Sequence, residues 1–98
     1  SLHDALPIWQ LLTPQGCMAV NLFGRSHSYA RSLEKISAVF GADAVWAFKP
    51  TREGNTVVLA QRTPQQPTRM ALLDRAEAVQ SRWGLPAVKW LKLFKPVA

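Results

Sequence analysis

The sequence has little cysteine, histidine and acidic charge, and it has no long hydrophobic run. Its single cysteine, Cys17, has no partner for an intrachain disulfide. One cysteine and two histidines are also too few for a structural zinc site. The apolar runs are only a few residues long, whereas a bilayer-spanning helix needs roughly 20 apolar residues. The sequence therefore predicts neither a disulfide-stapled domain, nor a zinc module, nor a transmembrane protein.

The composition is that of a small globular domain, or of a piece of a larger one. The 98 residues are 48% hydrophobic and 18% charged, which excludes a disordered chain. Twelve Lys and Arg against six Asp and Glu give a net charge of +6. This basic balance makes an acidic partner worth considering.

The first half of the chain has the pattern of a strand followed by a helix. Residues 17–23 form a nearly continuous apolar run, which is typical of a strand buried on both faces, with Cys17 as a small core residue. The next segment has an apolar stripe at helical spacing and ends at Gly41. The stripe consists of Leu33, Ile36, Val39 and Phe40.

Two further strands are expected at 44–48 and 56–60. The polar stretch 49–55 between them contains Pro50 and Gly54 and favours a hairpin. A helix joins the first strand to the second, so these two should run parallel with a right-handed crossover. The third strand should then be antiparallel to the second.

The C-terminal part is expected to contain a linker, a basic helix and a tail. Residues 61–67 are rich in proline and glutamine, and a helix should run from Thr68 to the Gly84 stop. Its predicted buried stripe consists of Leu72, Leu73, Ala76, Val79 and Trp83. Of the other tryptophans, Trp46 fits the core, and Trp9 and Trp90 are expected to cover sheet edges. The pattern as a whole predicts an α/β chain of the order strand, helix, strand, antiparallel strand, helix.

Residues 1–8 resemble a translated sequencing adapter. Their sequence, SLHDALPI, can be encoded by TCC CTA CAC GAC GCT CTT CCG ATC, which resembles the end of a common sequencing adapter. The alternative is a native loop. We therefore expect three parts: a non-native segment at 1–8, an α/β part at 9–62, and the linker, basic helix and tail at 63–98. The first expected strand also lacks a second neighbour within the chain, which independently favours a fragment.

The chain resembles the C-terminal part of the spermidine synthase (polyamine aminopropyltransferase) family between Trp9 and Gln61. The resemblance is carried by four segments: LTPQG at 12–16, VNLFG at 20–24, FG at 40–41 and GNTVVLA at 54–60. That family belongs to the Rossmann-like, S-adenosylmethionine-dependent methyltransferase fold. The resemblance implies a C-terminal fragment of such a sheet, in which the antiparallel third strand lies between the first two.

The resemblance also implies where a substrate would bind. The family's glycine-rich cofactor loop and catalytic aspartate lie upstream, so no catalytic, cofactor-binding or metal-binding residue is expected here, and the fragment itself should be inactive. Ligands of open α/β sheets bind at the carboxyl ends of the strands, which points to Asn21 and to Arg52 and Glu53 in the hairpin loop. Arg52 and Glu53 depart from the family's Tyr-Pro-Ser-Gly-type stretch. Glu53 would attract a polyamine and Arg52 would repel one. Alternatively, Asn21 satisfies backbone groups and the loop is a solvated turn.

His27 lies between two serines, an arrangement that suggests nucleophilic catalysis. Adjacent residues rarely reach that geometry, and a capping loop is the expected structure.

The implied activity of the parent is transfer of an aminopropyl group from decarboxylated S-adenosylmethionine to a small amine, in the cytoplasm. The first alternative is a small-molecule methyltransferase that uses S-adenosylmethionine on the same sheet. The second is a non-enzymatic basic module for nucleic acid or an anionic membrane, because +5 of the net charge lies from Arg62 onward. Its cations are Arg62, Arg69, Arg75, Arg82, Lys89, Lys92 and Lys95. Because the arginines of the expected helix lie off its apolar stripe, they indicate an ordinary solvated face, and a nucleic-acid partner is not expected.

Overall fold

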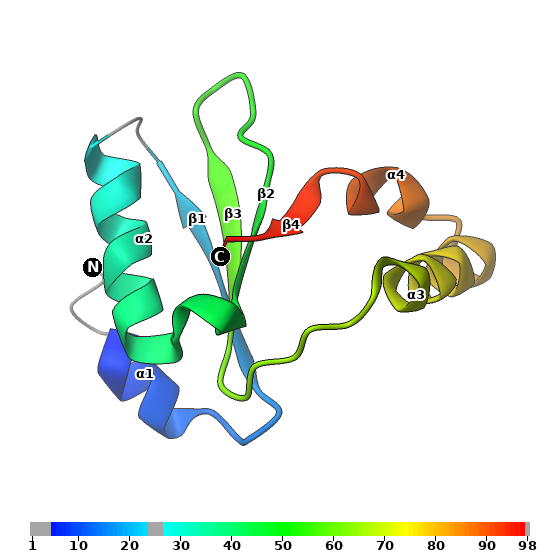
Figure 1. The fold of residues 1–98 in the computed structure, drawn as a ribbon. Coiled ribbons are helices and arrows are strands. Elements are labelled where there is room, and N and C mark those ends of the chain that lie inside the picture. The colour runs from blue at the N-terminus through cyan, green and yellow to red at the C-terminus, as the bar shows by residue number, and fades with distance from the viewer. Residues whose placement is uncertain (1–4, 24–26, 98) are drawn as a thin grey trace.

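A computed structural model of the chain describes residues 5–23 and 27–97, which form one sheet with helices on either side (Figure 1). In chain order the elements are α1 (Ala5–Leu11), β1 (Cys17–Leu22), α2 (His27–Phe40), the short 3-10 helix η2 (Ala42–Ala44), β2 (Val45–Phe48), β3 (Thr56–Gln61), α3 (Arg69–Trp83), α4 (Ala87–Leu91) and β4 (Phe94–Pro96). The mixed α/β class expected from the sequence is confirmed. Residues 5–8 of the suspected adapter segment form the start of α1, and residues 1–4 lie outside the described part.

The strands are arranged in the order β1-β3-β2-β4, and each hydrogen-bonded pair is antiparallel. Val58 of β3 lies opposite Val20 of β1 and also opposite Ala47 of β2. Because β1 and β2 are both antiparallel to β3, they run parallel to each other. The expected hairpin, the parallel relation of the first two strands and the insertion of the third between them are therefore confirmed.

The core lies between the sheet and the helix pair α1 and α2 (Figure 1). Ile36 of α2, Val45 of β2 and Val58 of β3 are completely buried there, and Phe40 is nearly so. The amphipathic stripe predicted for α2 therefore faces the sheet, and its burial contributes to the apolar core. Gly41, with φ of +96°, ends α2 in a conformation that a residue with a Cβ would adopt only with strain.

The expectation that residues 17–23 are buried on both faces is wrong. Exposure alternates along β1: Met18, Val20 and Leu22 face the core, while Cys17 and its alternate neighbours face solvent. Cys17 is an exposed free thiol rather than a core residue. The reason is that β1 lies at the edge of the sheet, and no described helix covers its second face.

The helix predicted from Thr68 is confirmed, but its packing differs from the prediction. The hydroxyl of Thr68 accepts a hydrogen bond from the Ala71 amide at 3.1 Å and caps the helix. Ala76 is buried, whereas Trp83, expected in the core, is 61% exposed. The helix packs mainly against α4, which is too short to cover the whole stripe.

The C-terminal tail forms two elements that the sequence did not predict, α4 and β4. Phe94 of β4 stacks on Trp46 with ring centroids 5.0 Å apart and contacts Phe48 at 4.7 Å. These aromatic contacts bury Trp46 to 5% exposure, as expected for a core tryptophan. Trp9 packs against the core from α1, and Trp90 is 44% exposed on α4.

Within residues 5–23 and 27–97, no helix is long and apolar enough to cross a bilayer.

Candidate functional site

Asn21, the first predicted substrate-binding residue, lies near the carboxyl end of β1. It is paired with Val57 across the β1–β3 ladder. Its neighbours Val20 and Leu22 face the core, so the Asn21 side chain is on the other, solvent-exposed face. Its position at a strand end agrees with the sequence analysis, and its role in binding stays a prediction.

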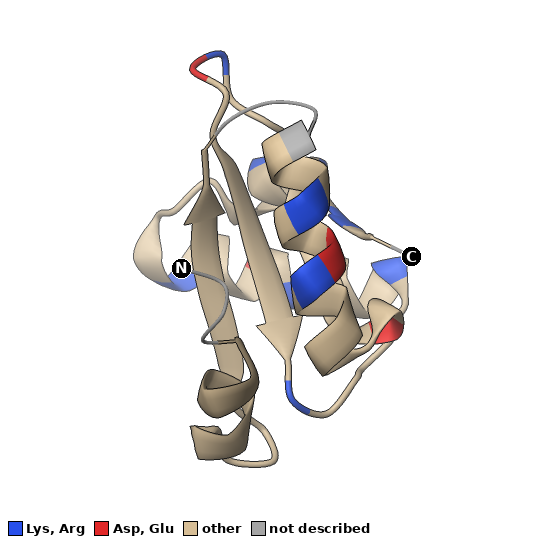
Figure 2. Cartoon of the chain, turned by 90° about the vertical axis from the view of Figure 1, so that its left-hand side faces the viewer, with Lys and Arg blue, Asp and Glu red and all other residues tan. Residues whose placement is uncertain are grey.

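Arg52 and Glu53 occupy the tip of the β2–β3 loop (Figure 2). Both are exposed. Thr51 closes the loop: its amide donates to the Asn55 carbonyl at 2.9 Å, and its hydroxyl accepts from the Asn55 amide at 3.2 Å. Gly54, with φ of +88°, makes the tight turn. The loop is thus an ordered turn that holds one positive and one negative charge side by side in solvent.

The three predicted residues lie at the same end of the sheet but share no pocket. Leu22, which follows Asn21, pairs with Thr56, the first residue after the loop. None of the four cavities described below is lined by Asn21, Arg52 or Glu53. Arg52 offsets the charge of Glu53, and charges exposed in this way are screened by water and salt, so these residues alone attract a cation only weakly.

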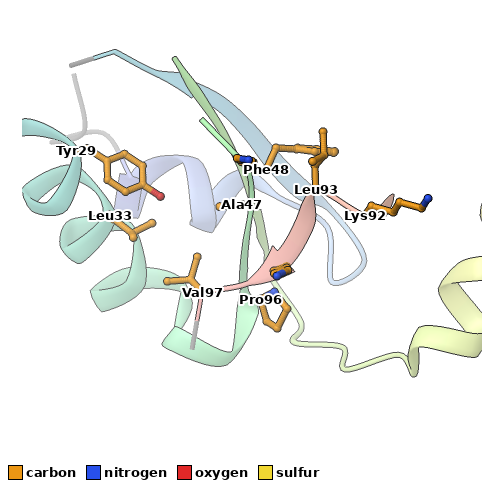
Figure 3. Close-up of a pocket in the computed structure, with 10 residues that line it drawn as sticks. Tyr29, Leu33, Ala47, Phe48, Lys92, Leu93, Pro96 and Val97 are labelled. Carbon is orange, nitrogen blue, oxygen red and sulfur yellow. The ribbon is translucent and has the colours of Figure 1, made fainter. Parts of the chain in front are cut away.

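A cavity of about 430 Å³ lies between α2 and the β2–β4 edge of the sheet (Figure 3). Its volume is within the range of small-molecule sites. It includes the segment directly after β2, where the sequence analysis expected ligands to bind. It is lined by Tyr29, Leu33, Ala47, Phe48, Lys49, Lys92, Leu93, Lys95, Pro96 and Val97.

The ladder between β2 and β4 places two of the lysines on the side of the sheet that faces α2. Lys95 lies directly opposite Ala47, which packs against the core on that side. The Lys49 amide donates to the Leu93 carbonyl at 2.8 Å and continues the ladder by one residue. Because side chains alternate along a strand, Lys49 and Lys95 emerge on the same face.

Apolar side chains form the wall and floor of this cavity. Tyr29 and Leu33 are four residues apart on α2 and therefore lie one turn apart on the same face. The Val97 amide donates to the Val45 carbonyl at 2.9 Å, which brings Val97 against the core. Figure 3 shows Tyr29 and Leu33 on α2 across the cavity from Val97.

The polar groups of the cavity are positive or neutral. No carboxylate is among its lining residues, which include three lysines. Figure 3 shows Lys92 extending away from Tyr29 and Val97, so Lys92 contributes little charge to the interior. Burial raises the pKa of Tyr29 above its ordinary value of 10.0, and its hydroxyl therefore stays protonated at neutral pH and can donate a hydrogen bond.

A second cavity, of about 330 Å³, lies between α3 and the other face of the sheet. Trp46, Leu59 and Phe94 form its sheet side, and Leu72 and Arg75 come from α3. Two further cavities lie along α3 and α4 and include Lys92 in both linings. These cavities lie where α3 and α4 pack loosely against the sheet and against each other.

Residues that could hold a metal or a nucleotide are not gathered in the described part of the chain. Residues 5–23 and 27–97 contain no group of three His, Cys, Asp or Glu side chains close enough to ligate a metal ion. The described glycines lie in separate turns rather than in one glycine-rich loop. His27 is the first residue of α2. Its side chain, the preceding residues 24–26 and the predicted capping loop lie outside the described part.

The sequence does not predict most of the lysine-lined cavity. Residues 63–98 are expected to form a linker, a basic helix and a tail, and the segment LFKPV at 93–97 has no apolar/polar alternation and contains a proline, so it gives no clear strand signal. The helical spacing of Tyr29 and Leu33 was the available signal. What joined the two segments, the pairing of β4 with β2, is a tertiary contact.

Comparison of the chain with protein-family models, with curated proteins and with solved structures found no match.

Proposed function

We propose that this chain is the C-terminal part of a Rossmann-like transferase related to the spermidine synthases. The parent would transfer an aminopropyl group from decarboxylated S-adenosylmethionine to a small amine. The observation that carries the proposal is the antiparallel β3 between the parallel strands β1 and β2. That strand order is the one the resemblance implies for the end of such a sheet.

The open edge of β1 supports the same proposal. Within the described residues, β1 is hydrogen-bonded to β3 on one side only. Its exposed face carries Cys17, Ala19 and Asn21, without the lysine or proline that commonly protects a free edge. In the proposed parent, a preceding strand would pair here.

Aminopropyl transfer requires an amine to attack the carbon next to a sulfonium in line, with a base that removes the ammonium proton. Glu53 would attract the cationic amine by charge, and Asn21 would accept a hydrogen bond from it at the carboxyl end of β1. Arg52 would oppose a polyamine and favour a smaller or less charged amine. The base and the cofactor loop would be upstream, so the chain by itself is expected to be inactive.

The genomic DNA upstream of the Trp9 codon tests this proposal directly. A reading frame that continues into a glycine-rich strand-to-helix turn and a strand-end aspartate would support a truncated transferase. The residues around that aspartate would distinguish aminopropyl transfer from the alternative, methyl transfer to a small molecule. A start codon at or just before Ser1 would contradict the proposal.

The parent enzyme also allows a test of Glu53. Glu53→Gln should raise the KM for the amine by up to about fivefold, because an exposed ion pair contributes about 1 kcal/mol or less. Glu34→Gln, an exposed carboxylate on α2, is the control and should leave KM unchanged. Equal KM values for both variants would remove Glu53 from the amine site.

One observation favours the non-catalytic alternative, a basic surface for an acidic partner. Trp83 and Trp90 are exposed, and the guanidinium of Arg82 lies 4.9 Å from the Trp83 ring centroid. Cations beside exposed aromatic rings can bind nucleic acid or an anionic membrane. Such binding should weaken steeply between about 50 and 200 mM salt. An absence of binding to oligonucleotides and anionic vesicles even at low salt would eliminate this alternative.

A further inference from the structure

The lysine-lined cavity between α2 and β4 has a charge arrangement that an anion would stabilise. Lys49 is opposite Leu93, and Lys95 is opposite Ala47. The two lysines are therefore diagonal neighbours on one face of an antiparallel pair, with Cβ atoms separated by about 7–8 Å or less. Both ammonium groups can reach a single point above the sheet.

The cavity combines these two cations with an apolar lining. Both lysines are exposed, so water screens their mutual repulsion. Ala47 and Val97 pack against the core beneath them, and Tyr29 and Leu33 line the same cavity from α2. The lining contains no carboxylate that would compete for the ammonium groups. A bound anion can therefore accept a charge-assisted hydrogen bond from each lysine.

The apolar part of the cavity is large enough for more than an inorganic ion. The whole cavity has a volume of about 430 Å³, and Figure 3 shows Leu33, Val97 and the Tyr29 ring around the space next to Ala47. An aromatic body could lie against these side chains while its acid group faces the lysines. The protonated Tyr29 hydroxyl is a further donor at the same wall.

We propose that the cavity between α2 and the β2–β4 edge binds a small aromatic carboxylate, with its ring against Tyr29, Leu33 and Val97 and its carboxylate between Lys49 and Lys95. The site is distinct from the Asn21, Arg52 and Glu53 end of the sheet. Its charge selects against the cationic amines of the proposed transferase.

Three probes with the same ring and different charge test this site on the purified chain: 2-naphthoate, 2-naphthalenemethanol and 2-naphthylmethylamine. Titrations followed by backbone amide chemical shifts should show naphthoate binding best and the amine worst. The shifts should centre on Leu33, Phe48 and Val97. Equal binding of the amine and the acid, no binding of naphthoate at millimolar concentration, or shifts centred on Trp83 and Trp90 would each overturn the proposal.

Lysine variants distinguish binding of naphthoate in this cavity from general attraction of an anion to a basic protein. Lys49→Gln and Lys95→Gln should each weaken naphthoate binding by about three- to fivefold, since each removes one exposed ion pair with the carboxylate. Lys35→Gln removes the same charge from an exposed position on α2 that does not line the cavity, and it should leave the affinity unchanged. Circular dichroism would verify that all three variants remain folded. An equal loss in Lys35→Gln and Lys95→Gln would overturn the site.

Discussion

At the scale of single residues, Arg62 connects the first helix to the sheet. Its guanidinium Nη1 donates to the carbonyls of Leu12 and Gln10, the latter at 3.5 Å, and lies over the Trp9 ring, with Cζ 4.3 Å from the centroid. Its backbone amide donates to the Gly16 carbonyl at 3.0 Å. By its position in the sequence, Arg62 belongs with the basic C-terminal residues. In the structure its positive charge instead satisfies carbonyls at the end of α1.

Replacement of Arg62 by alanine should therefore destabilise the fold. The loss of a charged hydrogen bond and of the contact with the Trp9 ring predicts a decrease of about 2 kcal/mol in the free energy of unfolding. Arg62→Lys should recover only part of it, because an ammonium cannot contact the ring and both carbonyls at once. Urea denaturation at neutral pH measures the free energy of unfolding of the unsubstituted chain and of both variants.

Arg52→Ala is the matched control, because it removes the same side chain from the exposed loop tip. Its effect should remain within about 0.5 kcal/mol. Similar destabilisation in both variants would show that net charge, rather than the contacts of Arg62, controls stability.

At the scale of elements, α2 and β1 differ in how completely their sequences determine their packing. The apolar stripe of α2 occupies a single face at helical spacing, and Ile36 and Phe40 from it are buried. The apolar run of β1 does not distinguish a strand buried on both faces from one buried on one face. In the structure, half of its side chains face solvent. An apolar stripe on a helix specifies which face packs against the core, whereas a uniform apolar run in a strand does not.

The burial of Ile36 leads to a test of the α2 packing. Ile36 is fully buried, and Ile36→Ala should lower the free energy of unfolding by about 3 kcal/mol through lost burial and an unfilled cavity. Leu11→Ala removes a similar side chain that is 86% exposed, and it should change stability by less than about 0.5 kcal/mol. Chemical denaturation of both variants compares them. A small effect of Ile36→Ala would mean that α2 is not packed on the sheet as described.

At the scale of the whole molecule, the sheet has two different edges. β4 pairs with β2 at one edge, and β1 forms the other (Figure 1). The backbone of β1 can pair with another strand, and its sequence between Cys17 and Leu22 contains no charge. Unprotected edges of this kind favour strand pairing between molecules.

We therefore expect the isolated chain to self-associate through β1 under reducing conditions. Ala19→Lys introduces a charge on the exposed face of this strand, and a symmetric dimer would contain it twice. If each introduced lysine costs about 0.5–1 kcal/mol, the dimer dissociation constant should rise by about tenfold. Sedimentation velocity over a concentration series measures the self-association of both proteins.

Ala38→Lys makes the same substitution at an exposed position on α2. It changes the net charge equally and should leave the association unchanged. A monomer at all concentrations, or equal effects of both lysines, would contradict association through β1.

The sequence alone determined the local structure of this protein. Helical spacing placed α2 and α3, and Gly54 with its polar neighbours placed the hairpin loop, because propensity and turn chemistry act over a few residues. The resemblance supplied the position of β3 between β1 and β2, which the structure contains. The predicted residues Asn21, Arg52 and Glu53 lie at the expected end of the sheet.

Only the tertiary structure decided which surfaces are covered. It exposed Cys17 and Trp83, converted the basic tail into α4 and β4, and brought Lys95 beside α2 to form a cavity. The physical reason is that burial and charge proximity depend on neighbours far along the chain. A periodic pattern shows that a face can be buried, and the partner that covers it is determined by the packing of the whole molecule.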